Sequence, residues 1–385
     1  MSIFTRTVSL LLIIASLFCY VTVKITAQEN APPSVSAQSA ILIDGNSGVV
    51  ILEKQADIRL PMASTTKIMT ALVALENASL DTVITVDPRA VGVEGSSIYL
   101  VEGEQLTLEQ LLYALLLESA NDAATAIAIG VAGSVEAFAD LMNQTANRLG
   151  LENTRFQNPH GLDHSEHYTT ARELAIIARE ALKNPTLASI TATRKTTIPH
   201  SGNDGVRLLV NHNRLLREYD GAIGVKTGFT KRSGRCLVSA AERNGATMIA
   251  VTLNAPDDWR DHTALLDYGF SKMETVILCD AHQLCIPVSV VGGDRSAVFV
   301  SNTEELIVSI PRDRSEIQKT VELPRFLYAS VEAGETVGRV IYQSDLNGDG
   351  ELETVGTVSL TAQSTVKQQK KKRSIRQWLR SLWKR

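Results

Sequence analysis

Cysteine is scarce in this sequence, and no cysteine or histidine residues stand at the spacing of metal ligands. Four of the 385 residues are cysteines, and Cys236, Cys279 and Cys285 lie beyond the N-terminal segment. Because three is odd, at least one thiol must be free or paired outside the chain. Cys279 and Cys285 are near enough along the chain for a local disulfide, whereas Cys236 lies in an apolar run and is interpreted as a core residue. The sequence predicts neither a metal centre nor a cofactor.

Long hydrophobic runs are also scarce, and the one at the N-terminus is short. Arg6 precedes an apolar stretch at residues 8–23, which ends in polar residues around Ala27. This pattern predicts a secretory signal peptide over residues 1–28, and therefore an exported protein. An uncleaved membrane anchor is the alternative, but the apolar run is short and two prolines follow it in a linker at residues 29–37.

Acidic residues are missing from the C-terminal segment, residues 366–385, which carries nine basic residues. Its large apolar residues recur at helical spacing: Ile375, Trp378, Leu379, Leu382 and Trp383. A helix with an aromatic, apolar face and a cationic face is typical of a membrane-surface anchor. The alternatives are a disordered basic tail, which the two tryptophans disfavour, and a nucleic-acid-binding patch, which export disfavours. We therefore expect a membrane partner and no nucleic acid.

The full chain has the composition of a folded protein with about two domains. Its 385 residues are 44% hydrophobic and 21% charged, with a net charge of −4. Strand-like and helical patterns alternate over residues 38–275, which favours an α+β domain with helices packed against an antiparallel sheet. Residues 276–365 contain short β-type runs separated by turn residues and predict a small all-β domain. A calcium-loop-like pattern at residues 345–350 lacks the required glutamate, since Gly356 stands at the twelfth position, so a hairpin turn is expected there.

Three short motifs together predict the chemistry. They are Ser64-Thr65-Thr66-Lys67, Ser119-Ala120-Asn121 and Lys226-Thr227-Gly228. Each is weak alone, since Ser-x-x-Lys recurs at Ser364 and Ser381 in the polar tail. Ser64, however, begins a run of helical apolar periodicity just after Pro61, which places it at a helix N-terminus with Lys67 one turn along. A plain helix N-cap is the alternative function of Ser64.

These residue types suit nucleophilic catalysis. A serine hydroxyl needs a base, and Lys67 can serve if burial and the like charge of Lys226 keep it neutral. Backbone N–H groups at the helix start would stabilise an anion formed at Ser64. Ser119 can pass a proton to a leaving amine, and Asn121 can orient Lys67, although both residues also favour an ordinary turn.

The third motif belongs to a predicted strand. A hairpin with an Asn244-Gly245 turn follows it, and the motif strand itself is interpreted as an edge strand. Lys226 and Thr227 offer an ammonium and a hydroxyl to a terminal carboxylate, and Gly228 lets a peptide approach the backbone. An ordinary strand followed by a glycine turn is the alternative.

With these motifs the chain resembles the serine-type D-alanyl-D-alanine carboxypeptidases, the low-molecular-mass penicillin-binding proteins of peptidase family S11. Further stretches at residues 158–163, 167–171 and 265–270 share the resemblance. It implies a penicillin-binding/β-lactamase-like transpeptidase domain, followed by a small all-β domain and a C-terminal amphipathic helix. It implies these site residues: catalytic Ser64, Lys67 and Ser119, and substrate-binding Asn121, Lys226, Thr227, Gly228, Phe229 and Arg260.

The resemblance also implies their roles. Ser64 would form an acyl-enzyme, and the backbone N–H groups of Ser64 and Phe229 would form the oxyanion hole. Arg260 would lie near the carboxylate site; the alternative is a solvated charge at a helix start.

The expected function is an exported serine D-Ala-D-Ala carboxypeptidase that acts on peptidoglycan stem peptides in cell-wall biogenesis and is acylated by β-lactams such as penicillins. A DD-endopeptidase or a serine β-lactamase could use the same catalytic set, but a class A lactamase normally has Ser-Asp-Asn where this chain has Ser119-Ala120-Asn121. A non-catalytic wall-binding protein is the third alternative, and the complete set of motif residues disfavours it. The predicted location is the outer face of the cytoplasmic membrane, with the C-terminal helix as a peripheral anchor.

Overall fold

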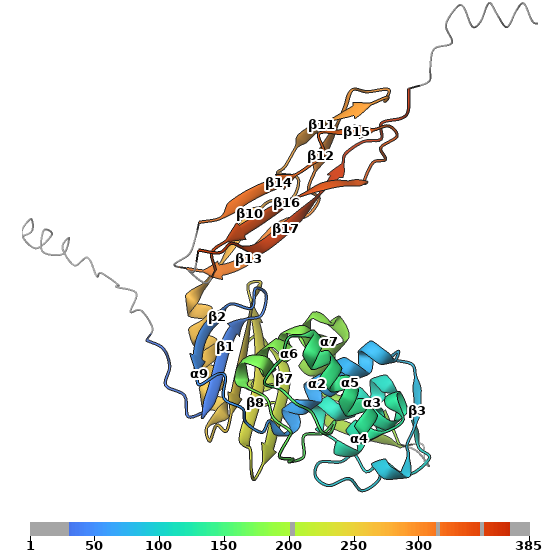
Figure 1. Ribbon diagram of the computed structural model, residues 1–385, viewed down its shortest axis with the longest axis vertical. Helices are drawn as coiled ribbons and strands as arrows, with labels where there is room; N and C mark the ends of the chain where they lie inside the picture. The colour runs from blue at the N-terminus through green and yellow to red at the C-terminus, as the bar shows by residue number, and fades with distance from the viewer. Residues whose placement is uncertain (1–30, 201–204, 313–315, 347–349, 370–385) are drawn as a thin grey trace, which may run out of the picture. The chain divides into compact units, whose positions relative to one another are not determined.

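The computed structural model describes residues 31–200, 205–312, 316–346 and 350–369 (Figure 1). The predicted signal peptide and residues 370–385 of the predicted tail helix lie outside these ranges.

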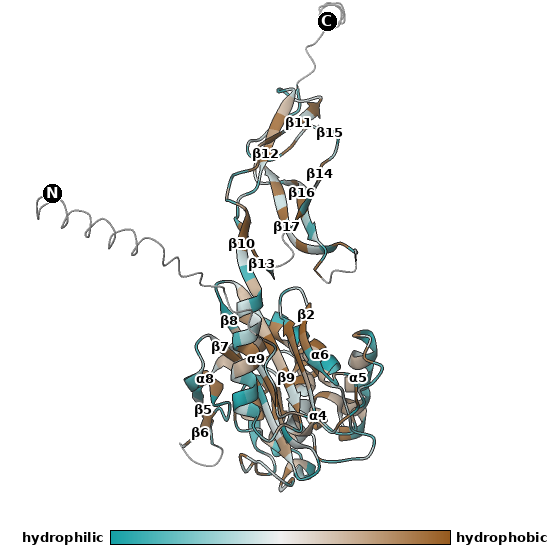
Figure 2. Cartoon of the chain, turned by 90° about the vertical axis from the view of Figure 1, so that its left-hand side faces the viewer, coloured by the Kyte–Doolittle hydropathy of each residue, from teal (hydrophilic) through white to brown (hydrophobic). Residues whose placement is uncertain are grey.

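A five-stranded antiparallel sheet forms the centre of the first domain. Its strand order is β2 (Val50–Lys54), β1 (Ser39–Asp44), β9 (Ala246–Leu253), β8 (Gly234–Arg243) and β7 (Ala222–Thr230). Strands β8 and β9 are buried along most of their length because helices cover both faces of the sheet. Figure 2 shows apolar residues along these central strands. Strand β7 is an edge strand, as the sequence predicted, so one side of it remains available.

The Asn-Gly turn is confirmed. Asn244 and Gly245 join β8 to β9 with φ angles of 51° and 79°. Two successive positive φ values fit the two-residue hairpin turns whose twist matches that of the strands, and asparagine and glycine adopt them most easily.

Helices cover the two faces of the sheet unequally (Figure 1). Helix α9 (Asp258–Lys272) packs on one face, against β9, β8 and β1. The other face carries a larger helical layer with its own core. This layer contains α2 (Lys67–Asn77), α3 (Leu108–Leu117), α4 (Asn121–Ala132), α5 (Val135–Arg148), α6 (Ala171–Lys183) and α7 (Pro185–Ala192). The short elements around it are η1 (Ala63–Thr66), η2 (Pro88–Ala90), α8 (Leu215–Glu218) and the hairpins β3 (Val83–Thr85)–β4 (Gln105–Thr107) and β5 (Lys195–Pro199)–β6 (Val206–Val210).

Local signals explain where these helices begin. Thr107 and Gln110 form a reciprocal capping box at the start of α3, and Ser134 and Thr170 cap α5 and α6. Helix α4 lies deep in the helical layer, because its first eight residues are all buried. Within the described ranges, no single helix has the length and hydropathy of a membrane span; α4 and α5 reach them only as a pair bent by 84°.

The second domain is all-β, as predicted. Strands β10 (Met273–Cys279) and β13 (Leu306–Pro311) pair with each other. A six-stranded sheet has the order β14 (Gln318–Glu322), β16 (Thr336–Ser344), β17 (Glu353–Ala362), β12 (Ala297–Ser301), β11 (Ile286–Val291) and β15 (Phe326–Tyr328). Strand β10 begins directly after α9, ahead of the predicted start of this domain at residue 276. Strands β16 and β17, which flank the expected hairpin turn at residues 345–350, pair antiparallel, and residues 347–349 of that turn lie outside the described ranges.

Two details of this domain bear on the sequence analysis. Cys279 is buried and Cys285 exposed, and neither forms a disulfide, so the local bond considered above is not made. The first residues of the predicted tail are extended and not helical. Val366 pairs with Val331, and the Gln369 N–H donates to the Gly292 carbonyl.

Candidate active site

Ser64 lies where the sequence predicted, at the start of a helix. It belongs to the short helix η1, which runs directly into α2 at Lys67. The hydroxyls of Thr65 and Thr66 donate to the carbonyls of Met62 and Ala63, at 2.6 and 2.8 Å. These bonds fix the first turn, so Ser64 is presented on a rigid corner.

Lys67 is fully buried beside Ser64. Its Nζ is 3.0 Å from Ser64 Oγ, 2.6 Å from Asn121 Oδ1 and 2.7 Å from the His160 carbonyl oxygen. Two of these partners can only accept hydrogen bonds. A neutral amine has two N–H donors and one lone pair, so it can satisfy both acceptors and still accept the Ser64 proton.

The surroundings of Lys67 favour that neutral state. Burial lowers its pKa well below the usual value, the charge of Lys226 lowers it further, and Asp122 opposes them. Burial likewise lowers the pKa of Lys226 to about 7, against a smaller effect of Glu118. The sequence predicted the Lys226 contribution; the larger one, burial, comes from the helical layer.

The middle motif forms the corner between α3 and α4. Ser119 has a φ of 59° and Asn121 is the first residue of α4. The Asn121 side chain accepts from Lys67 and donates to the Glu94 carbonyl, while its backbone N–H donates to the Ser96 carbonyl at 2.7 Å. Asn121 is therefore held at both ends of its amide, and its predicted contact with Lys67 is made.

Gly228 is required for a reason that the sequence analysis did not foresee. A Cβ built at this position would lie 3.1 Å from the backbone nitrogens of Ser64 and Thr65, and 3.2 Å from the Ala63 side chain. The close approach is thus between strand β7 and η1 of the same chain. It sets the backbone of β7 directly against the backbone N–H of Ser64.

A cleft of about 340 Å³ opens beside Ser64. Its lining residues are Ser64, Ser96, Ser119, His212, Thr227, Gly228, Phe229, Arg235, Asp258 and Trp259. Lys67, Asn121 and Lys226 lie behind this lining, since each is at most 4% exposed. Of the predicted site residues, Arg260 is the one set apart: its side chain is 73% exposed and its Nε lies 3.1 Å from Asp257 Oδ2.

The sequence analysis missed five of the lining residues: Ser96, His212, Arg235, Asp258 and Trp259. His212 Nε2 lies 3.2 Å from Glu118, next to Ser119. Arg235 lies just after the turn from β7 to β8 and pairs with Phe229, three residues beyond Lys226 on β7. Its position in a hairpin with the Lys226 motif was the signal that could have identified it.

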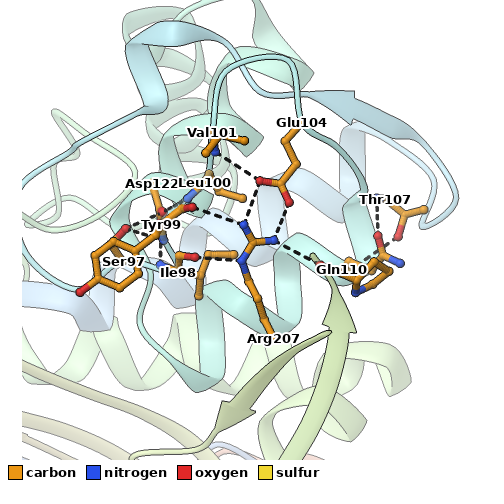
Figure 3. A network of polar contacts seen from close by, with 11 residues as sticks. Ser97, Ile98, Tyr99, Leu100, Val101, Glu104, Thr107, Gln110, Asp122 and Arg207 are labelled. Carbon is orange, nitrogen blue, oxygen red and sulfur yellow. Dashed lines mark hydrogen bonds and ion pairs between the residues drawn. The ribbon is translucent and has the colours of Figure 1, made fainter. Parts of the chain in front are cut away.

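A buried ionic network supports the middle motif from behind (Figure 3). Asp122 accepts from the Ser97 hydroxyl at 2.6 Å and from the Leu100 N–H at 3.0 Å. Arg207 of β6 bonds Glu104 at 2.9 Å and the Ile98 carbonyl at 2.9 Å. Together they fix the segment at residues 94–104, which supplies the carbonyls that hold Asn121.

The fold and this geometry define a class: a serine enzyme in which a buried lysine contacts the candidate nucleophile, Ser64, and no histidine of the described ranges does so. The family model described as D-alanyl-D-alanine carboxypeptidase matches residues 26–257. The chain therefore belongs to this family, peptidase S11, and is a serine-type carboxypeptidase.

Individual relatives agree. D-alanyl-D-alanine carboxypeptidase DacF of Bacillus subtilis is 32% identical over 319 residues, which cover 80% of this chain and 82% of that protein. DacC of Escherichia coli is 34% identical over 87% of this chain and 86% of its own length. Among solved structures, a peptidoglycan synthesis regulatory factor (PBP3) from Streptococcus pneumoniae superposes with a TM-score of 0.73 at 26% identity, covering 87% of this chain and all of that one (100%). These matches confirm the predicted family and fold.

Proposed function

We propose that this protein is an exported DD-carboxypeptidase that removes the terminal D-alanine from peptidoglycan stem peptides through an acyl-enzyme at Ser64. The observation that carries the proposal is the contact of 3.0 Å between Lys67 Nζ and Ser64 Oγ, in surroundings that lower the lysine pKa. A neutral Lys67 can take the hydroxyl proton as Ser64 attacks the carbonyl carbon of the scissile bond.

The next steps use groups on either side of Ser64. The N–H groups of Ser64 and Phe229 would bind the oxygen of the tetrahedral intermediate, because η1 and β7 are packed together at Gly228. Collapse of the intermediate expels D-alanine, whose nitrogen takes a proton through Ser119. Water then hydrolyses the ester at Ser64, with Lys67 again accepting a proton.

Substrate binding would use the edge of β7. An extended peptide can hydrogen-bond along this strand. Thr227 supplies a hydroxyl for the terminal carboxylate, and Lys226 supplies positive charge from behind the strand, where its Nζ is 3.0 Å from the Thr227 carbonyl. A β-lactam carries a carboxylate and a reactive carbonyl and would acylate Ser64 in the same way.

The predicted signal peptide and basic tail complete the proposal. They would locate the enzyme at the outer face of the cytoplasmic membrane, where it would act in cell-wall biogenesis and cell shape.

The test measures free D-alanine released by the mature protein from a stem pentapeptide, alongside labelling by a fluorescent penicillin. Ser64→Ala should abolish both, with its thermal unfolding unchanged, because only the nucleophile is lost. Cleavage of cross-linked muropeptides without D-alanine release would support the endopeptidase alternative, and rapid penicillin turnover the β-lactamase. Persistent labelling of Ser64→Ala would overturn the assignment of the nucleophile.

A further inference from the structure

The cleft contains an arginine that neither the motifs nor the proposed mechanism uses. Arg235 is near the start of β8 and pairs with Phe229 of β7. Side chains of paired residues point to the same face of a sheet, and so do those two positions apart along one strand. Thr227 and Arg235 therefore project from the same face, as diagonal neighbours on adjacent strands, and both line the cleft.

The Arg235 side chain is held in place from below by the start of α9. Its Nε donates to Asp258 Oδ1 at 2.9 Å, and Asp258 is only 3% exposed. Its guanidinium carbon lies 5.8 Å from the centre of the Trp259 ring. The bond to Asp258 uses Nε alone. Within the described parts of the chain, the two terminal nitrogens of Arg235 have no hydrogen-bond partner.

Other basic residues near the cleft are less suited to contact a ligand directly. Lys226 is 2% exposed, and its Nζ donates to the Thr227 carbonyl. His212 is engaged by Glu118, and Arg214 by Glu218. Arg260 pairs with Asp257 and does not line the cleft. Arg235, by contrast, lines the cleft and is 43% exposed.

We propose that Arg235 is the residue that directly binds the terminal carboxylate of the substrate, together with the Thr227 hydroxyl, and that Asp258 and Trp259 position it. This inference rests on the proposed function and names the recognition element of its substrate. A guanidinium offers two parallel N–H donors that match the two oxygens of a carboxylate. Asp258 Oδ1 accepts hydrogen bonds from Arg235 Nε and from the Trp259 N–H, at 2.9 Å each. These bonds leave the terminal nitrogens of Arg235 available to other partners.

The test compares a D-alanyl-D-alanine peptide that has a free carboxylate with the same peptide as its C-terminal amide. In the mature protein, Arg235→Gln should lower kcat/KM for the free acid by about 10- to 100-fold and change that for the amide by less than about threefold. Arg235→Lys keeps the charge but not the two-point geometry, so it should retain an intermediate activity. Arg232→Gln, in the exposed turn between β7 and β8, is the matched control and should leave kcat/KM unchanged for both substrates.

Acylation of Ser64 by benzylpenicillin and by its methyl ester provides a second readout, with the same selective loss expected for the free acid. This readout still decides the role of Arg235 if the wild-type protein releases no D-alanine, a result that would contradict only the proposed function. Equal losses on acid and amide, or a carboxylate-selective loss in Arg260→Gln instead, would overturn the inference. If Arg235→Gln unfolds, Arg235→Lys decides: wild-type preference for the free acid would count against the two-point contact.

Discussion

Lys67 shows how much of the chemistry depends on the surroundings of a single residue. Its Nζ has three partners, and two of them, Asn121 Oδ1 and the His160 carbonyl, fix it in place without providing a counter-charge. Burial and Lys226 both lower its pKa. The amine is thus oriented by neutral acceptors, and its environment lowers its pKa and so favours the neutral form that a general base requires.

The coupling between the two lysines predicts a pH effect. Lys226→Met keeps much of the side-chain volume but removes the charge, so the pKa of Lys67 should rise. Because Lys67 acts as a base only when neutral, the acidic limb of the pH profile for acylation by benzylpenicillin should move to higher pH. Lys231→Met, at an exposed position just beyond β7, is the control and should leave the profile in place. An unchanged acidic limb in Lys226→Met would show that the two lysines are not coupled.

At the scale of elements, the segment at residues 94–104 connects distant parts of the chain to the site. It is tied to α4 through Asp122 and to β6 through the ion pair of Arg207 with Glu104. The side chains of this pair are 8% and 0% exposed. A carbonyl of this segment accepts a hydrogen bond from Asn121, and Asn121 in turn accepts one from Lys67. Loss of the ion pair should therefore change the position of Lys67.

This network predicts a large stability effect for a small change. Glu104→Gln would leave the buried Arg207 charge unpaired, and the free energy of unfolding should fall by about 3–5 kcal/mol, as measured by chemical denaturation. Glu180→Gln breaks the exposed pair with Lys183 and should cost less than about 1 kcal/mol. Replacing both partners, as Glu104→Leu with Arg207→Met, should recover most of the loss, because no charge then stays unpaired. Similar small losses in Glu104→Gln and Glu180→Gln would mean that water replaces the missing partner.

The same elements show what the sequence could and could not predict. Local signals placed the Ser64 helix, the Asn244-Gly245 turn and the β-type runs correctly, because each depends on neighbouring residues. The reason for Gly228, the pairing of Arg207 with Glu104 and the place of Arg235 depend on contacts between residues far apart in the chain. Nothing in the spacing of a lone arginine distinguishes a buried ion pair from a solvated charge. Resemblance to a family supplied the site residues, but it did not show that Arg260 lies outside the cleft.

For the whole molecule, the candidate active site and the start of the predicted tail belong to regions with separate hydrophobic cores. The residues proposed for catalysis and carboxylate binding all lie within residues 64–235 and depend on the cores around the five-stranded sheet. The second domain has a separate core, formed by strands β10 to β17 and closed by Val366. The start of the predicted tail is thus part of the β domain, since Val366 and Gln369 are bonded to it.

This boundary determines how the membrane proposal is best tested. Removing residues 370–385 deletes eight of the nine basic residues of the predicted tail, together with both of its tryptophans, but keeps the pairing of Val366 and Gln369. The truncated protein should retain its D-alanine release and thermal stability and lose its sedimentation with anionic vesicles. Truncation after residue 365 is the comparison, and it should unfold at a lower temperature because Val366 leaves the β-domain core.

Substitutions within the full-length tail separate the two forces that would hold it to a membrane. Trp378→Ala with Trp383→Ala should weaken binding to neutral and anionic vesicles alike, since the tryptophans supply apolar contact area. Replacing basic residues with acidic ones should matter mainly on anionic vesicles at low salt, because each basic residue contributes about 1 kcal/mol near such a surface and salt screens it. Equal sedimentation of the full-length protein and the form that ends at residue 369 would show that the tail is not the anchor.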